Sequence, residues 1–223
     1  MVISSDEIEQ CRTSEQLKHF VADVRERVES DPEQMQRALR KEGVYRQFVN
    51  EIIPLSQFSH LLYDENTKFK PVLGNQGFDV EVFDRKGRRI DHIEIAKPHD
   101  GYTEAKDNKL LEDHGIGKIR AYKYGGQLDA IASWIDETVQ KKSDKDYSDC
   151  TLVIVAAIDP PYEEESPEVK RRSEELVANL KKTSFNAKRV FLAIPALDEC
   201  FEIGGLHVVA VDRPKRCRAS AGN

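Results

Sequence analysis

The sequence lacks the features that mark membrane, disulfide-rich and zinc-binding proteins. Its 223 residues include four cysteines without paired spacing, so neither a disulfide framework nor a zinc site is indicated. No run approaches ~18 consecutive apolar residues, and the first ten residues, MVISSDEIEQ, turn acidic before a signal-peptide core develops. We therefore expect no membrane segment and a reducing, cytoplasmic location.

Short catalytic signatures are also missing. The sequence GIGK at 115–118 lacks the full P-loop spacing and the Ser or Thr that follows it. His92 and His99 lack the helical i, i+4 spacing of a metalloprotease, and no cysteine lies near them. No nucleophile motif is present either. Nucleotide-binding P-loops, zinc proteases and serine hydrolases are therefore disfavoured.

The charge balance limits how the chain would meet nucleic acid. Charged residues make up 33% of the chain and apolar residues 39%, which is ordinary for a globular protein. The formal net charge of -6 argues against coating of nucleic acid along the whole surface, but it leaves room for a local basic groove.

The first 62 residues have the apolar spacing of helices. Residues 1–43 are expected to form an N-terminal helical extension, whose helices offer a surface for a second copy or a protein partner. Asp31 and Pro32 begin one helix and Gly43 ends it. A further helix follows, and Pro54 is expected to kink or split it. The predicted apolar stripes are Leu17, Phe20, Val21, Val24 and Val28, and then Phe48, Ile52, Leu55, Phe58 and Leu62.

The pattern changes to a period of two in the middle of the chain. Val80 and Val82 alternate with acidic residues, and Ile93 and Ile95 do the same after the basic turn DRKGRR, in which Gly87 supplies the left-handed position. These runs predict a β-hairpin with one apolar and one ionisable face, preceded at 64–76 by a connector or a poorly formed strand.

The rest of the chain is typical of an α/β domain with a mixed central sheet. We expect this domain over 44–212, with a polar loop at 98–126 and a basic flexible tail at 213–223. A fully apolar strand after a helix indicates a β-α-β crossover. The expected elements are helices at 127–142 and 169–180 and strands at 151–158, 189–195 and 206–211.

The ionisable face of the hairpin is the candidate functional site. Asp79, Glu81 and Glu94 share it without an alternating lysine, and like charges on adjacent strands repel by up to ~1 kcal/mol. Carboxylate oxygens are hard ligands suited to Mg²⁺. A cation-binding face is one interpretation; the solvent face of an edge hairpin is the other.

The order of elements resembles the PD-(D/E)XK nuclease superfamily, with GFDVEVF supplying Asp79 and HIEIAK supplying Glu94. The resemblance covers roughly residues 45–158. It implies an αβββαβ restriction-endonuclease-like core and a Mg²⁺ (or Mn²⁺) ion held by Asp79 and Glu94. Glu81, and Glu51 from the preceding helix, would assist in holding the ion. It also implies that Asp79, Glu94 and Lys97 are the catalytic residues for phosphodiester hydrolysis, with DNA as the leading substrate.

The family pattern places one residue between acid and lysine, whereas this chain reads Glu94-Ile95-Ala96-Lys97. A bulge before Pro98 would return Lys97 to the site. Alternatively the polar group comes from the helix side, as Lys123 or Gln127, or the site is inactive. Substrate phosphates are expected at Lys86, Arg88, Arg89, Lys123 and Gln127. The alternative function is a catalytically inactive nuclease-fold module that binds nucleic acid or a protein partner.

Overall fold

The fold is that of a computed structural model, in which most of the 223 residues are described. Several predictions lie outside the described residues: most of the loop at 98–126 with His99 and Lys123, the end of the strand at 151–158, nearly all of the strand at 206–211, and the tail at 213–223. Side chains are not described at 126–129 and 167–170. The described residues are 3–74, 76–98, 106–107, 109–110, 113–114, 126–156, 167–195 and 198–206.

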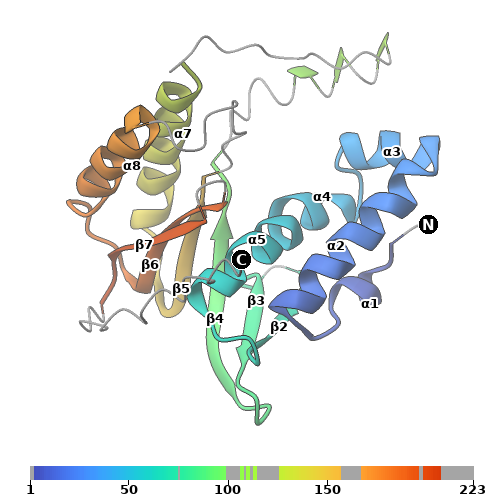
Figure 1. Ribbon diagram of the computed structural model, residues 1–223, viewed down its shortest axis with the longest axis horizontal. Coiled ribbons are helices and arrows are strands. Elements are labelled where there is room, and N and C mark those ends of the chain that lie inside the picture. The colour runs from blue at the N-terminus through green and yellow to red at the C-terminus, as the bar shows by residue number, and fades with distance from the viewer. Residues whose placement is uncertain are drawn as a thin grey trace, which may run out of the picture.

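A mixed sheet of seven strands forms the centre of the described chain, in the spatial order β1-β2-β3-β4-β5-β6-β7 (Figure 1). The first four strands are antiparallel, β4, β5 and β6 are parallel, and β7 returns antiparallel to β6. The strands are β1 (Arg12–Thr13), β2 (Lys68–Pro71), β3 (Val80–Phe83), β4 (Arg89–Ala96), β5 (Tyr147–Val155), β6 (Ala187–Ile194) and β7 (Glu199–Gly204).

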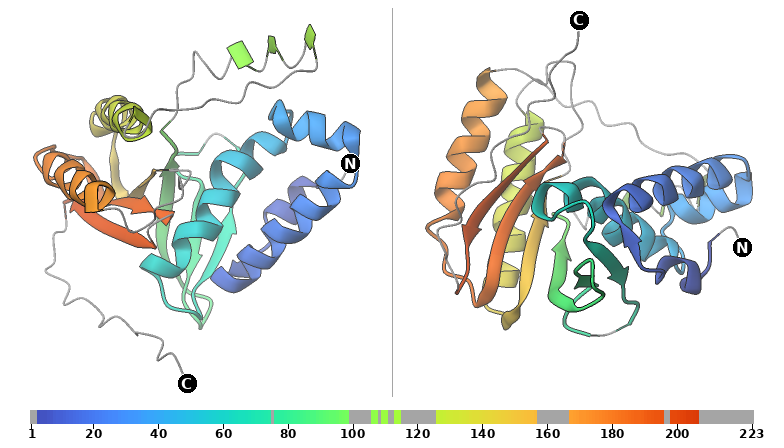
Figure 2. Two further views of the ribbon diagram at one scale, coloured as in Figure 1. Left: turned by 45° about the horizontal axis from the view of Figure 1, so that its top comes forward. Right: turned by 60° about the horizontal axis from the view of Figure 1, so that its bottom comes forward.

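Helices cover both faces of this sheet. Two views in Figure 2 show the N-terminal helices on one side and α7 and α8 on the other. Each side has its own apolar core, one built with Leu17, Phe58 and Ile95 and the other with Ile135, Leu152 and Leu180. The helices are α1 (Ser5–Ile8), α2 (Ser14–Glu29), α3 (Pro32–Leu39), α4 (Tyr45–Gln47), η1 (Phe48–Ile52), α5 (Ile53–Leu62), α7 (Gly126–Ser143) and α8 (Pro167–Leu180).

The helical patterns of the N-terminal region are confirmed. A capping box between Thr13 and Gln16 begins α2, and Asp31 caps α3 with Pro32 in its first turn. The predicted stripe of α2 is fully buried, and it belongs to the same core as β2 to β5. The short strand β1 also pairs with β2. The described residues before Gly43 therefore include one strand of the main sheet and a helix that packs against its core.

The predicted disturbance at Pro54 is confirmed and takes the form of a wide turn. The chain runs as a π-helix from Phe48 to Ile52 and returns to α-helix in α5, where Pro54 lies in the first turn. Proline has no N–H, and its ring clashes with the carbonyl four residues earlier, at Asn50. A wider turn before the proline accommodates both effects, and it changes the direction in which Glu51 leaves the helix.

The hairpin forms with the predicted alternation. Val80 lies opposite Ile93 and Glu81 opposite His92, and Gly87 has a positive φ of 75° in the turn. The pairing irregularity between β3 and β4 lies between Val82 and Phe83, near the turn, rather than before Pro98. The register therefore keeps the apolar residues against the N-terminal helices.

The order α5, β2, β3, β4, α7, β5 reproduces the expected αβββαβ arrangement, and the α/β fold class is confirmed. The poorly formed strand expected at 64–76 is β2. Two strands were missed: β1 has only two residues, and β7 has the mixed sequence ECFEIG without an apolar run. Strands this short or this polar carry too little periodicity to be recognised.

Candidate functional site

A cavity of about 790 Å³ opens where β3 begins and β4 ends. Three elements build it: η1 with the preceding α4, the β3–β4 hairpin, and α7. Charged side chains of both signs line it: acidic ones come from all three elements, and basic ones come chiefly from α4 and α7. The lining residues are Arg46, Asn50, Glu51, Asp79, Glu94, Ile95, Ala96, Lys97, Trp134, Glu137, Thr138, Lys141 and Lys142.

Asp79 and Glu94 meet across the hairpin. The register that pairs Val80 with Ile93 puts Asp79 next to Glu94, one residue before β3 begins. Because β3 starts only at Val80, the Ile95 N–H lies beyond its ladder, and the Asp79 Oδ2 atom accepts it at 2.7 Å. This bond fixes the orientation of the Asp79 carboxylate at the mouth of the hairpin.

Glu51 reaches the same cavity from the π-helical turn. Glu51 thus adds a third acidic side chain, from the helical layer, to Asp79 and Glu94 from the sheet. The placement is the one that the family resemblance implies for Glu51. It depends on the wide turn before Pro54, because a change in helical pitch rotates every side chain in that turn.

Burial and repulsion between neighbouring acidic groups raise the pKa values of two of these carboxyl groups. Burial, together with the charges of Asp79 and Glu94, raises the pKa of Glu51 to about 8. Burial and the charge of Glu94 raise the pKa of Asp79 to about 6, although the bond from Ile95 opposes that rise. Glu51 and Asp79 thus lie close enough to neighbouring carboxylates for their own ionisation to be disfavoured.

A lysine from the end of α7 contacts Glu94. The Lys142 Nζ atom donates to Glu94 Oε1 at 2.5 Å and to the Tyr147 hydroxyl at 3.2 Å. The Tyr147 hydroxyl donates to the same Glu94 oxygen at 3.3 Å. Burial by itself would lower the pKa of Lys142, but the bond to Glu94 outweighs it and the pKa is raised. Lys142 is therefore a charged ammonium at neutral pH.

Lys97 also lines the cavity, although its spacing from Glu94 is irregular for the family. The pairing of β4 with β5 continues without interruption to Ala96, so Lys97 is the first residue beyond the strand. Two lysines from different elements, Lys97 and Lys142, therefore border the same acidic surface.

Glu81 is not brought to this cavity. It shares the face of Asp79 and Glu94, but its carboxylate binds Arg89 at 3.0 Å and Lys70 at 3.5 Å. The hydrogen bond from Arg89 lowers the pKa of Glu81. The geometry gives Glu81 two cations of the protein, and the expected auxiliary ligand role finds no support.

The predicted phosphate-binding residues of the hairpin turn also lie away from the cavity. Arg88 pairs with Asp84 at 2.7 Å, and Arg89 pairs with Glu81. Lys86 and Arg88 border a separate, smaller depression at the turn. Figure 1 shows this turn at the end of the hairpin opposite to the strand end that carries Lys97. The expected contact between these residues and a phosphate in the site is therefore not supported.

Of the two predicted helix-side residues, Lys123 lies outside the described chain, and Gln127 lies in α7 with its side chain undescribed. The sequence analysis missed Lys142, Tyr147, Arg46 and Trp134. A partial signal existed on α7, where Trp134, Thr138 and Lys141 follow at helical spacing along the side next to the buried isoleucines, with Lys142 at its lower end.

The donor set suits a hard divalent cation in its chemistry. Carboxylate oxygens are the protein ligands that Mg²⁺ and Mn²⁺ prefer, and a bound cation would favour the ionised forms of Glu51 and Asp79, whose pKa values burial and neighbouring acidic groups raise. Among the residues that the structure describes, no group of three or more Asp, Glu, His or Cys side chains converges as a formed metal site. Binding one ion through all three carboxylates thus requires side-chain movement.

Comparison of the chain with protein-family models, curated protein sequences and solved structures gave no significant match. In the described part of the chain, no helix is both long and apolar enough to span a bilayer.

Proposed function

We propose that this protein is a divalent-metal-dependent nuclease that hydrolyses phosphodiester bonds, with DNA as the leading substrate. One observation carries the proposal: Glu51, Asp79 and Glu94 come from different elements and line one cavity, in which burial and the neighbouring carboxylates raise the pKa values of Glu51 and Asp79. Groups arranged in this way lower stability unless a cation or substrate recovers the energy, so the arrangement favours a functional site over an ordinary solvent face.

Each side chain of the proposed site has a separate task. A bound Mg²⁺ or Mn²⁺ would supply an activated water and stabilise charge on the phosphate. Asp79 is held by the Ile95 N–H, and Glu94 by Lys142 and Tyr147, so the orientations of both proposed ligands are set by their partners. Glu51 adds a third carboxyl group from the helical wall, and a bound cation would favour its ionised form.

The amine of this site is assigned to Lys142 in the first place. Because its pKa is raised, Lys142 stays protonated and acts as a cation that stabilises negative charge, and it does not remove a proton from water. The irregular spacing of Lys97 is then explained, since an amine from α7 takes the place that the family gives to the lysine after the acid. The αβββαβ order of elements supports the same proposal.

The test is cleavage of plasmid, linear duplex and single-stranded DNA with Mg²⁺, with Mn²⁺ and with EDTA. Asp79→Asn and Glu94→Gln should each reduce metal-dependent cleavage by about 100-fold or more, because transition-state stabilisation is lost. Glu81→Gln is the matched control: it lies on the same face of the same hairpin but outside the cavity. Its cleavage rate should stay at the wild-type level. Full cleavage by Asp79→Asn would overturn the assignment of the site.

A second candidate is a binding module that kept the fold without catalysis. Two observations favour it: Lys142 already neutralises Glu94 at 2.5 Å, and the described carboxylates do not converge on one point. Such a module would bind nucleic acid without cleaving it in either metal. Calorimetric titration with Mn²⁺ separates the two candidates, because only the nuclease requires saturable metal binding that Asp79→Asn abolishes.

A further inference from the structure

The wall that α7 contributes to the cavity has a composition that the hydrolytic chemistry does not explain. Trp134, Thr138 and Lys141 line it at intervals of four and three residues, which places them on one side of the helix above Lys142. Trp134 lies eight residues before Lys142, about 12 Å along the helix axis. An aromatic ring therefore borders the same cavity at a distance from the acidic groups.

Trp134 is the single tryptophan of the chain, and it is only partly buried. It packs against the apolar core beneath α7 and also lines the cavity. A ring supported by a rigid helix, with part of its surface open to a polar cavity, is a stacking platform for a flat apolar group. Nucleobases have such a face, and stacking on aromatic side chains is the usual way in which proteins hold unpaired bases.

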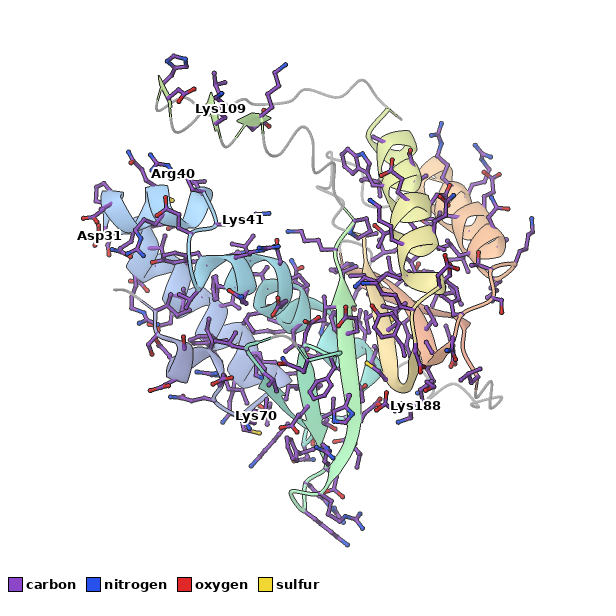
Figure 3. All side chains as sticks on the ribbon, turned by 180° about the vertical axis from the view of Figure 1, so that it is seen from behind. Asp31, Arg40, Lys41, Lys70, Lys109 and Lys188 are labelled. Carbon is purple, nitrogen blue, oxygen red and sulfur yellow. The ribbon has the colours of Figure 1, made fainter. Side chains whose placement is uncertain are left out.

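The opposite wall supplies positive charge. Arg46 lines the cavity from α4, and Lys41 donates to the Asn50 side chain at 3.1 Å, which links the end of α3 to the same wall. Figure 3 shows Arg40 and Lys41 together at that end of α3. On the α7 side Lys141 pairs with Glu137 at 3.8 Å, and both side chains are more than half exposed. An exposed pair of this kind contributes little stability, so Lys141 can exchange its partner for a phosphate.

The acidic groups are recessed, and this determines which form of nucleic acid reaches them. The side chains of Glu94 and Lys142 are 14% and 20% exposed. The bases of a duplex are stacked on one another, so none is available to Trp134 without unstacking. An unpaired strand can place a phosphate at the recess and the base of a neighbouring nucleotide on the indole.

We propose that this cavity takes a single-stranded segment of nucleic acid, with Trp134 stacking on a base next to the phosphate at the carboxylates and Arg46 contacting the backbone. The proposal deepens the proposed nuclease function and rests on it for the identity of the ligand. It assigns Trp134 a role in binding an unpaired base and none in the hydrolytic step.

Binding is measured with the full-length protein in EDTA, so that cleavage plays no part, by the fluorescence anisotropy of labelled DNA and RNA oligonucleotides. Single strands should bind more tightly than a blunt duplex of the same sequence, and they should quench the intrinsic fluorescence of Trp134. Trp134→Ala should weaken single-strand binding between about 5-fold and 150-fold, as for the loss of one stacked base. Trp134→Phe should recover most of the loss, because a ring remains.

Phe201→Ala is the matched control. Phe201 is partly buried against the same core as Trp134 but does not line the cavity, so this variant loses core packing without losing the stacking surface. It should bind the single strand as wild type does, and circular dichroism confirms that each variant is folded. Equal weakening by Phe201→Ala and Trp134→Ala would overturn the proposal, as would equal affinity for duplex and single strand.

The two proposals fail in different ways. Binding of single strands that depends on Trp134, without cleavage in either metal, supports the stacking proposal and removes the nuclease. Metal-dependent cleavage that requires Asp79 but does not change in Trp134→Ala supports the nuclease and removes the stacking proposal. The DNA and RNA oligonucleotides separate the two sources of an unpaired base, since only RNA offers a 2′-hydroxyl.

Discussion

Acidic residues lie at both ends of the β3–β4 hairpin, but their pKa values are shifted in opposite directions at the two ends. At the open end, Asp79 and Glu94 lie beside Glu51, and the pKa values of Asp79 and Glu51 are raised. Toward the turn, Glu81 and Asp84 bind arginines, and their pKa values are lowered. A hairpin in which acidic and apolar residues alternate can therefore carry ordinary ion pairs at one end. At its other end it can carry carboxyl groups whose ionisation is disfavoured.

The difference follows from where the neighbouring layers end. Near the turn the hairpin extends past the helices, so flexible arginines of the same hairpin reach the carboxylates. At the open end, η1 and α7 lie over both faces and bury the carboxyl groups, and Lys142 is the one cation in hydrogen-bonding contact with Glu94 that the described structure shows. Carboxyl groups that repel one another, with too few neighbouring cations to balance them, thus mark the open end of the hairpin as the candidate functional site.

Another acidic residue of the hairpin, Asp91, gives the largest expected effect on stability. Its buried carboxylate accepts hydrogen bonds from Tyr63 at 3.0 Å, Thr151 at 2.7 Å and Lys188 at 2.8 Å. Asp91→Ala leaves these donors unpaired and should lower the free energy of unfolding by about 3 kcal/mol in urea denaturation. Metal binding should not change, because Asp91 does not line the cavity. Lost metal binding in a folded variant would contradict the separation of the two ends.

Removing the Lys142 ammonium that contacts Glu94 should strongly reduce activity. We expect Lys142→Ala to slow metal-dependent cleavage by about 100-fold, within the range for a positioned catalytic side chain. Lys97→Ala, at the same cavity, should slow it by less than about tenfold, and Lys145→Ala, at an exposed position just beyond α7 and outside the cavity, is the control. If Lys97→Ala is the more damaging variant, the family's original lysine position holds and Lys142 is a positioning residue.

Neutralising Glu51 should stabilise the fold. The folded-state pKa of Glu51, about 8, lies above its ordinary value, so the folded protein binds more protons than the unfolded chain and stability falls as pH rises through this interval. Glu51→Gln should therefore raise the free energy of unfolding at pH 8 by roughly 2 kcal/mol. Glu81→Gln breaks an ion pair and should lower it by less than about 1 kcal/mol. A loss of stability in Glu51→Gln would contradict the repulsion described for the open end.

The pH dependence of metal affinity should come from the carboxyl groups at the open end of the hairpin and not from those near the turn. Ligands must be deprotonated to bind a cation, and with a pKa of about 6 the carboxyl group of Asp79 ionises between pH 5 and pH 7. The apparent affinity for Mn²⁺ should rise about tenfold over this interval. Titration calorimetry of Glu81→Gln should show the same rise. If Asp79→Asn still binds Mn²⁺ with that tenfold gain, another group is responsible.

Much of the fold was recoverable from local patterns. The stripe of α2, the cap of α3, the break at Pro54 and the alternation of Val80 with Glu81 each depend on residues close together in the chain. The same alternation is enough to predict that Asp79 and Glu94 share one face of the hairpin. The strands β1 and β7 were missed because a short or polar strand is specified by its partner and not by its own periodicity.

By itself the sequence determined the helices, the hairpin and the shared side of its two central carboxylates, because backbone periodicity decides which residues face together. Only the tertiary structure decided which side chains surround those carboxylates. In the folded chain Lys142, 48 residues away in sequence, donates a hydrogen bond to Glu94. Glu51 lines the same cavity, and Glu81 forms an ion pair with Arg89. Charges act across space, so the state of an ionisable group depends on the layers packed around it.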